Sequence, residues 1–330
     1  MTEAEAEAQA RTLFGPVADD LAAVEARLRE EIAGDPSEVG APMADLFGAG
    51  GKRIRPALVL LSAACGRYEL DRLLPAAMAV ELIHAATLVH DDVIDRSPTR
   101  RGRPTVAASL GDEPAIVVGD FYFAKAYELA ARTKAPEVVA VLAHAVMEIC
   151  AGEVRQQDIR YRYTTEITEY MNRIRAKTAA LLAACCEIGA WLGGLDEKSR
   201  EALVTFGHLL GLAFQIADDV LDYAGSEGEV GKPIGHDIEE GFATLPLMLA
   251  MEDRTRAPEL KDLLHDGRRL TEEQARHVVE LVRASDAPRQ AIAIAQTYSD
   301  TALSLLDSIA RREARDSLAA LAGYVVSRKL

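Results

Sequence analysis

The stretch AVELIHAATLVHDDVID, residues 79–95, decides the fold, and LLGLAFQIADDVLD at residues 209–222 repeats its pattern. In both, an apolar run with helical spacing leads into the pattern DDxxD, and apolar residues fill the two gaps of that pattern. The same pattern therefore closes two long helices. On a helix its first and fifth residues lie one turn apart on one face, so their carboxylates are neighbours.

A repeated DDxxD motif is costly unless a cation balances it. Like charges at this spacing repel, and anions at the end of a helix oppose its dipole. If the two helices face each other, each carboxylate pair at about 4 Å repels by about 4 kcal/mol at an effective dielectric near 20. Oxygen-only ligands favour Mg²⁺ or Mn²⁺, and Mg²⁺ prefers to share a substrate phosphate. One such motif is most often a solvated helix end, but the repetition predicts a metal-bridged phosphate site. The expected metal ligands are Asp91, Asp92, Asp95, Asp218, Asp219 and Asp222.

The composition favours a soluble protein with a sizeable core. Hydrophobic residues make up 49% of the 330 residues, and the net charge of −15 argues against nucleic-acid binding. Four cysteines without CxxC spacing are typical of a reduced protein. No signal-peptide pattern and no uncharged apolar stretch of about 18 residues occurs, so we expect a cytoplasmic location.

Helical periodicity predicts an all-α fold. We expect an N-terminal helix to about residue 33, a helix over 71–95, and further helices over 113–132, 135–160, 166–193 and 197–224. No long β alternation and no convincing linker interrupts them. The chain is therefore predicted to be a single domain over 1–330, with an N-terminal helix (1–35), a catalytic core (36–250) and C-terminal helices (251–330).

Two basic segments could hold an anion. GGKRIRP at residues 50–56 combines glycines, free amides and three cations at the start of a helix, although it does not satisfy the P-loop pattern. Arg100 and Arg101 follow the first DDxxD and could grip phosphate oxygens. His84 lies seven residues before Asp91, close to the same face and about 10 Å away. The alternative for the first segment is a basic surface turn.

A series of motifs in one order resembles the all-trans isoprenyl diphosphate synthases over residues 45–250. The series is GGKRIRP, ELIHAATLVHDDVID, RRGRPT, GDFYFAKA, GEVRQQ, RIRAKTAAL, GLAFQIADDVLDY, GKPIGHDI and GFATLPL. The resemblance implies a bundle of antiparallel helices around a deep central cavity. It also implies that isopentenyl diphosphate is added to an allylic diphosphate with loss of pyrophosphate, and that about three Mg²⁺ ions act when substrate is bound, with Mn²⁺ as an alternative.

The resemblance also implies roles for single residues. Asp91, Asp92, Asp95, Asp218 and Asp219 match its metal positions, with Asp222 completing the second motif. Arg100, Lys177 and Lys232 match catalytic residues that hold the allylic diphosphate, while Thr178 and Gln215 steady the cation formed from it. Lys52, Arg55, His84 and Arg101 match the isopentenyl diphosphate pocket.

Chain length is expected to depend on residues upstream of the first motif. Ala86 and Thr87 are small, and Ile83 lies further back. The first aromatic side chain that could block the channel of the growing product is therefore near Phe121. Products of about thirty carbons or more are therefore expected, as in the medium- and long-chain members, such as the catalytic component of heptaprenyl diphosphate synthase. One departure is Phe242, where many short-chain members have lysine; it leaves Lys177 and Lys232 as the principal cations on the allylic side.

Several alternatives stay open. The first is a geranylgeranyl or farnesyl diphosphate synthase. A class I terpene cyclase would share the ionisation step, but it would lack the basic segments and a repeated DDxxD. A non-catalytic synthase subunit would lose these aspartates, and a helical scaffold would need none of them. We expect a homodimer, with a heteromer that includes a regulatory subunit as the alternative, and transient membrane contact to release a long product.

Overall fold

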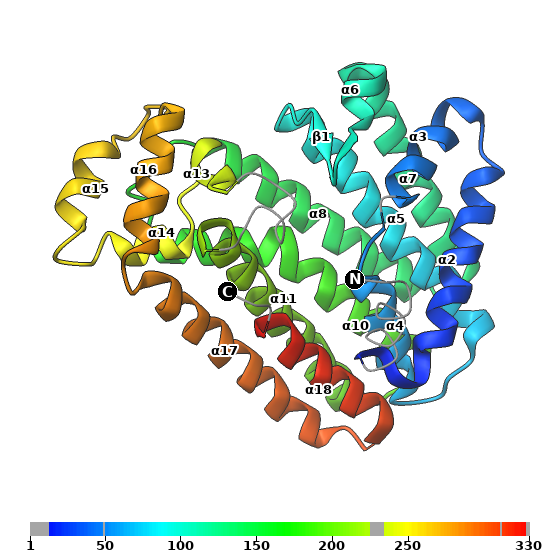
Figure 1. Ribbon diagram of the computed structural model, residues 1–330. Coiled ribbons are helices and arrows are strands. Elements are labelled where there is room, and N and C mark those ends of the chain that lie inside the picture. Colours follow the sequence, from blue (N-terminus) through cyan, green and yellow to red (C-terminus); the bar gives the residue numbers. More distant parts are fainter. Residues whose placement is uncertain (1–12, 49, 225–233, 311, 328–330) are drawn as a thin grey trace. The chain divides into compact units, whose positions relative to one another are not determined.

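The computed structural model describes residues 13–48, 50–224, 234–310 and 312–327. Helices dominate this part of the chain, which confirms the predicted all-α class (Figure 1). Its contacts divide it into two compact units. Unit 1 comprises residues 1–146, 181–205 and 305–321, and unit 2 comprises residues 147–180, 206–304 and 322–330. The expectation of one domain over 1–330 stays a prediction.

Unit 1 begins with helices that alternate with short turns. Their bounds are η1 (Gly15–Val17), α2 (Ala18–Ala33), α3 (Ser37–Gly48), α4 (Ile54–Ala64), α5 (Leu70–Ile94), α6 (Val106–Leu110) and α7 (Asp112–Arg132). Helices α10 (Ala180–Leu192), η3 (Leu306–Ser308) and most of α18 (Arg312–Val326) belong to the same unit. Two helices contribute residues to both units, α8 (Pro136–Asp158) and α11 (Glu197–Ala224).

Helix α5 is the core of unit 1. It packs along α7 and also contacts α4 (Figure 1), and most of its residues from Leu73 to Ala86 are buried. Helices α5 and α11 are long and apolar enough to cross a membrane by length and composition, but 67% and 61% of those windows are buried inside the protein. Burial of this extent is typical of helices in the core of a protein.

A β-hairpin follows α5, which the sequence did not predict. Strands β1 (Thr99–Arg100) and β2 (Arg103–Pro104) pair antiparallel, with Arg100 opposite Arg103. Arg101 and Gly102 form the turn with φ of 51° and 74°. Two left-handed residues are what a tight two-residue hairpin requires, and glycine adopts that conformation without strain. The hairpin sends Arg100 and Arg101 in different directions.

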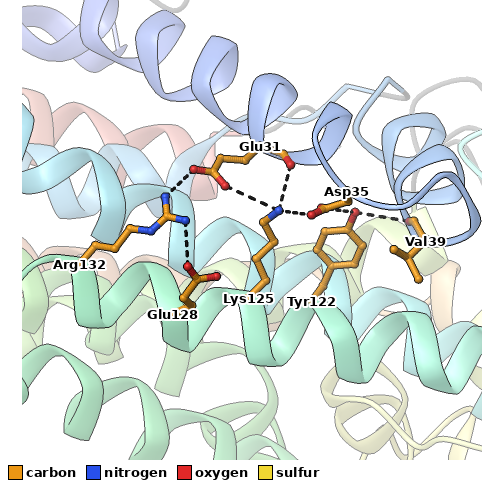
Figure 2. A network of polar contacts seen from close by, with 7 residues as sticks. All are labelled: Glu31, Asp35, Val39, Tyr122, Lys125, Glu128 and Arg132. Atoms are coloured by element: carbon orange, nitrogen blue, oxygen red, sulfur yellow. Dashed lines mark hydrogen bonds and ion pairs between the residues drawn. The ribbon is translucent and has the colours of Figure 1, made fainter.

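A polar network ties α2 and α3 to α7 (Figure 2). The Tyr122 hydroxyl donates to Asp35 at 3.1 Å, and Lys125 donates to the Glu31 carbonyl at 2.9 Å and pairs with Asp35. Arg132 closes the network between Glu31, at 2.5 Å, and Glu128, at 3.0 Å. Asp35 and Lys125 are mostly buried, so loss of either partner would leave an uncompensated charge.

Unit 2 contains a break in the predicted helix over 166–193. Helix α9 (Ile167–Ile174) passes into a π-helical turn, η2 (Arg175–Ala179), before α10 begins. Such turns are rare and often lie at functional sites, and this one contains Lys177 and Thr178. Gly211 of α11 lies against it, and a Cβ there would come within 2.4 Å of the Ala179 Cα.

The remaining helices of unit 2 follow the second motif in the chain. They are α13 (His236–Glu239), α14 (Leu245–Ala250), α15 (Ala257–Leu263), α16 (Glu272–Arg283) and α17 (Ala287–Leu305). Helix α16 contacts α13, α14 and α15. The C-terminal helices therefore support the segment that follows the second DDxxD.

Candidate active site

The first DDxxD closes α5, and Arg100 of the hairpin fixes its middle residue. Asp92 is 3% exposed and accepts three hydrogen bonds from Arg100, from Nε at 2.9 and 3.0 Å and from Nη2 at 2.8 Å. Asp91 and Asp95 are partly exposed. Both carboxylate oxygens of Asp92 therefore accept hydrogen bonds from Arg100, whereas Asp91 and Asp95 lie closer to solvent.

A cluster of cations lies earlier on α5, around His84. Burial, followed by the charges of Arg55 and Arg101, holds the pKa of His84 well below its ordinary value. Burial also lowers the pKa of Arg55, and Arg101 donates to the Gly50 carbonyl. His84 is therefore neutral at pH 7 among fixed positive charges. This arrangement brings together three of the residues predicted for the isopentenyl diphosphate pocket; Lys52 is exposed.

Two further residues complete this cluster: Arg53, one of the three cations of the predicted anion segment, and Glu81, which was not predicted as a site residue. Arg53 has φ of 52° at the start of α4 and donates to Glu81 at 2.8 Å. Glu81 is 5% exposed and also raises the pKa of Arg55 by its charge. Among the described residues, the Nε atoms of Arg53 and Arg55 are buried without a hydrogen-bond partner. Buried donors without acceptors fit an anionic ligand.

A pocket of about 280 Å³ lies beside the Asp92–Arg100 pair. Helix α3 lines one side of it, with Glu38 and Leu46, and α6 lines another, with Leu110. Arg103 reaches across to the Asp45 carbonyl at 3.3 Å. The hairpin therefore forms a wall that joins α3 to the end of α5.

The second DDxxD is held by neutral donors. Asp219 is 3% exposed, and its two oxygens accept hydrogen bonds from Tyr170 and Gln215, both at 2.7 Å. Thr178 donates to Gln215 at 2.6 Å. The predicted residues Thr178, Gln215 and Asp219 thus form one chain of hydrogen bonds in unit 2, and Tyr170 extends it.

Asp222 anchors the segment that follows the motif. It accepts backbone N–H groups from His236 at 3.2 Å and Asp237 at 3.0 Å. Burial and the charge of Asp237 raise the pKa of Asp222 to about 8 and that of Asp219 to about 7. Asp218 is exposed. In both motifs, therefore, the second aspartate is buried and bonded, and the first is closer to solvent.

Lys177, predicted for the allylic diphosphate, forms an ion pair. It donates to Glu153 at 2.9 Å, and Gln156 donates to the other oxygen of Glu153 at 3.0 Å. Glu153 therefore holds this lysine in place. Lys232 lies outside the described residues.

The predicted chain-length residues lie on two helices of unit 1. Ile83 and Ala86 are fully buried in α5, and the Thr87 hydroxyl donates to the His84 carbonyl at 2.7 Å. Phe121 of α7 is partly exposed and its ring meets that of Tyr122 edge-on, with centroids 5.2 Å apart. Because Tyr122 is bonded to Asp35, its ring is fixed toward α3 (Figure 2).

Metal binding fits the exposed members of the motifs. Within the part of the chain that the structure describes, no three aspartate, glutamate, histidine or cysteine side chains form a metal cluster by themselves. Carboxylate oxygens are nevertheless hard ligands suited to Mg²⁺, which binds through one or two carboxylates plus substrate phosphates. Each unit carries such carboxylates beside cations suited to phosphate, and the donor set fits the ion.

Three further residues of unit 2 were missed, Tyr170, Arg173 and Asp237. Tyr170 bonds Asp219 directly, and the charges of Arg173 and Asp237 act on the pKa of Asp219 in opposite directions. Tyr170 and Arg173 lie three residues apart on α9, and Lys177 follows four residues later. This helical spacing was the available signal, although the π-turn interrupts it.

Comparisons with known proteins identify the family. The family model described as polyprenyl synthetase matches residues 36–282. The chain is 40% identical over 319 residues to heptaprenyl diphosphate synthase component 2 of Geobacillus stearothermophilus, covering 96% of this chain and 98% of that protein. It is also 40% identical over 246 residues to a short chain isoprenyl diphosphate synthase of Methanocaldococcus jannaschii, covering 73% of this chain and 75% of that protein.

Solved structures agree with the sequence relatives. The polyprenyl synthase of Caulobacter crescentus, crystallised with calcium and isoprenyl diphosphate, superposes with a TM-score of 0.91 at 37% identity. The alignment covers 97% of this chain and 98% of that one. The predicted resemblance is confirmed: this chain belongs to the polyprenyl synthetase family and is a prenyltransferase.

Proposed function

We propose that this chain is an all-trans polyprenyl diphosphate synthase with a medium- or long-chain product. It adds isopentenyl diphosphate to an allylic diphosphate and releases pyrophosphate. The observation that carries this proposal is the separation of charge along α5. Cations surround the neutral His84, and carboxylates close the same helix from Asp91 onward.

The basic cluster takes the isopentenyl diphosphate. Arg55, Arg101 and His84 line this subsite with Lys52 nearby, and Arg53 and Glu81 keep the guanidinium groups together. Neutral His84 donates a hydrogen bond without adding charge. Two separate anions are then held by different means, because this subsite relies on cationic side chains and the allylic subsite relies on metal-bridged carboxylates.

The allylic diphosphate is bound between carboxylates and cations. We place the metal on the more exposed aspartates Asp91, Asp95 and Asp218, with the buried Asp92, Asp219 and Asp222 holding the surrounding groups in position. Mg²⁺, when bound, neutralises the charge of the departing diphosphate. We assign Arg100, Lys177 and Lys232 to the allylic diphosphate, as the resemblance to the family implies.

The reaction then follows from this placement. The allylic C–O bond breaks, and its electron pair leaves with the diphosphate. The double bond of isopentenyl diphosphate attacks the allylic carbon, and the proton lost from the new unit passes to pyrophosphate. Thr178 and Gln215 present oxygen atoms that steady the positive charge. No side-chain base is needed.

Product length is set by α5. The small side chains of Ala86 and Thr87 leave room for the growing chain. The aromatic ring of Phe121 of α7 then limits its length. The relative from Geobacillus stearothermophilus is a heptaprenyl diphosphate synthase component, which supports a medium chain. Its description as component 2 favours a second subunit as an alternative to a homodimer. We place the enzyme in the cytoplasm, with transient membrane contact for product release.

A labelled-substrate assay tests the reaction and the length together. The protein is incubated with labelled isopentenyl diphosphate, Mg²⁺ and either farnesyl or geranylgeranyl diphosphate, and the products are sized. We expect chains of about thirty carbons or more, no activity in EDTA and recovery with added Mg²⁺. Formation of no product with any divalent metal would refute the proposal.

A short-chain synthase is the second candidate. The 40% identity to a short chain isoprenyl diphosphate synthase favours it, although that match covers less of this chain. A twenty-carbon product in the same assay would select this candidate. Cyclic hydrocarbons released from the allylic substrate alone would instead indicate a terpene cyclase.

A further inference from the structure

Arg53, at the start of α4, lies between a carboxylate of α2 and a carboxylate of α5. Its Nη1 donates to Glu81 at 2.8 Å, and its Nη2 donates to Glu25 at 3.3 Å. The side chains of Arg53 and Glu81 are mostly buried, whereas that of Glu25 is 32% exposed. Helix α2 contacts both α4 and α5. The guanidinium group of Arg53 therefore joins three helices of unit 1.

The backbone of Arg53 has a conformation that arginine rarely adopts. Its φ of 52° and ψ of 30° are left-handed, which costs free energy for any residue with a Cβ. Such a conformation persists only where the surrounding contacts fix it. The Arg53 carbonyl accepts the N–H of Ala57 at 3.1 Å and so begins α4, whose first turn carries Arg55. Because Lys52 directly precedes it, Arg53 fixes the backbone between two cations proposed for isopentenyl diphosphate.

Gly51 makes room for the Arg53 side chain. A Cβ at this position would lie 2.8 Å from Nη1 of Arg53 and 3.5 Å from Nη1 of Arg101. Arg101 also donates to the Gly50 carbonyl. In addition, the guanidinium carbon of Arg53 lies 5.5 Å from the ring centroid of Phe47, within the range of cation–π attraction. Arg53 and Arg101 therefore both lie against the glycine loop that leads into α4.

The two carboxylates decide what Arg53 can contribute to an anion site. Glu25 and Glu81 balance its charge, so its net attraction for a diphosphate is weak. Its orientation is fixed instead, because each terminal nitrogen bonds a different helix. Among the described residues, Nε of Arg53 is buried without an acceptor, so direct contact with the anion is the alternative role. The two roles predict different effects of substituting Glu25.

We infer that Arg53 is a positioning residue of the isopentenyl diphosphate subsite, held between Glu25 and Glu81, and that α2 thereby belongs to this subsite. The inference rests on the proposed function, since the anion is the isopentenyl diphosphate assigned there. Glu25 lies outside every motif of the basic segments and the DDxxD repeats. It acts on the substrate only through Arg53, which holds the loop and the first turn of α4 in place.

Steady-state kinetics of Glu25→Gln, with separate titration of the two substrates, tests the inference by the sign of the change. The substitution keeps the size of the side chain, breaks the ion pair and makes the cluster more positive. If the cluster acted by charge alone, the KM for isopentenyl diphosphate would fall. We expect it to rise about threefold, with the KM for the allylic diphosphate within about twofold of the wild type. A fall, no change, or equal rises for both substrates would overturn the inference.

A double-mutant cycle separates positioning from direct contact. Arg53→Met should raise the KM for isopentenyl diphosphate about tenfold, and Glu25→Gln combined with it should add nothing, because the ion pair is already lost. Additive rises in the double variant would contradict the inference. A rise in Arg53→Met without any rise in Glu25→Gln would also contradict it, since Arg53 would then contact the anion directly. Circular dichroism checks that each variant is folded.

Arg29→Met is the matched control, because it removes the other guanidinium group from the same carboxylate. Arg29 donates to Glu25 at 2.7 Å on the exposed side of α2, where its own side chain is 68% exposed. The variant should leave both KM values within about twofold of the wild type. Equal rises in Arg29→Met and Glu25→Gln would refute the inference, since any change at Glu25 would then have the same effect.

A binding measurement keeps the inference separate from the proposed function. If the wild type forms no prenyl product, the proposed function fails on its own. Isothermal titration calorimetry with inorganic pyrophosphate in EDTA then compares the variants without metal. Weaker binding by Glu25→Gln than by the wild type and Arg29→Met supports the inference. Equal or tighter binding by Glu25→Gln, or no binding by the wild type, contradicts it.

Discussion

The two DDxxD motifs have the same sequence pattern and opposite surroundings. In the first, buried Asp92 is bonded to a guanidinium group, that of Arg100. In the second, buried Asp219 and Asp222 are bonded to a phenol, an amide and backbone N–H groups, and their pKa values are raised. The first motif therefore balances its charge internally. In the second, no cation of the described residues bonds the buried carboxyl groups directly, so they keep their protons to near-neutral pH unless a cation such as a metal ion favours the ionised form.

The largest expected effect is the loss of either exposed first aspartate. Asp91→Ala and Asp218→Ala should each lower turnover by about 10³ or more. Each substitution removes a carboxylate ligand of the metal that would neutralise the departing diphosphate. Helicity measured by circular dichroism should be unchanged, since both side chains are at least partly exposed. Turnover near the wild-type value in either variant would show that only one motif acts in catalysis.

Substitution of the buried middle aspartate should change the free energy of unfolding by different amounts in the two motifs. Asp92→Ala leaves the Arg100 guanidinium mostly buried without its partner, so it should cost about 3–5 kcal/mol of unfolding free energy in denaturant titration. Asp219→Asn removes a charge that only neutral groups bond, and it should cost much less or stabilise the metal-free protein. Equal losses would mean that the two environments do not differ in energy.

The pH dependence of stability should have opposite signs in the two regions. The folded carboxyls of Asp219 and Asp222 keep their protons up to pH of about 7 and 8, whereas unfolded ones lose them near 3.8. Their contribution to stability is therefore present at low pH and is lost as the pH rises toward 8. His84 has a lowered pKa, so its contribution is lost as the pH falls below 6.5.

Thermal unfolding in EDTA between pH 5 and 8 measures both contributions. Asp219→Asn should reduce the fall in Tm toward pH 8, and His84→Gln should reduce the fall toward pH 5. Added Mg²⁺ should restore Tm at pH 8 in the wild type, because the metal binds the deprotonated carboxylates. A pH profile that neither variant alters would contradict the assignment of these groups.

Substitutions of Ala86 and Thr87, which we propose line the channel of the growing product, should have the smallest effect on rate. Ala86→Phe and Thr87→Phe should shorten the product while the first condensation proceeds at a similar rate, because they block growth rather than chemistry. Sizing of the products tests this, with Met147→Phe on the exposed face of α8 as the control. An unchanged product distribution would remove α5 from the control of chain length.

Much of the site was predictable because its residues are local in sequence. The repeated motif, the apolar runs before it and the basic segments at 50–56 and 100–101 were identified from spacing alone, and the helices over 70–94 and 197–224 were confirmed. The hairpin after α5 and the π-turn at Lys177 were not. Both depend on pairing with other segments, since two-residue strands have no periodicity and a π-turn has no propensity signal.

By itself, the sequence determined which chemical groups this protein contains and which of them share a helix face, because both follow from residue type and a spacing of three or four. Tertiary structure decided which aspartate faces a guanidinium group and which faces a phenol. It also placed Phe242 under two arginines and Glu81 beside Arg53, Arg55 and Arg101. These contacts join residues far apart in the chain, and they arise only when the helices pack and exclude water.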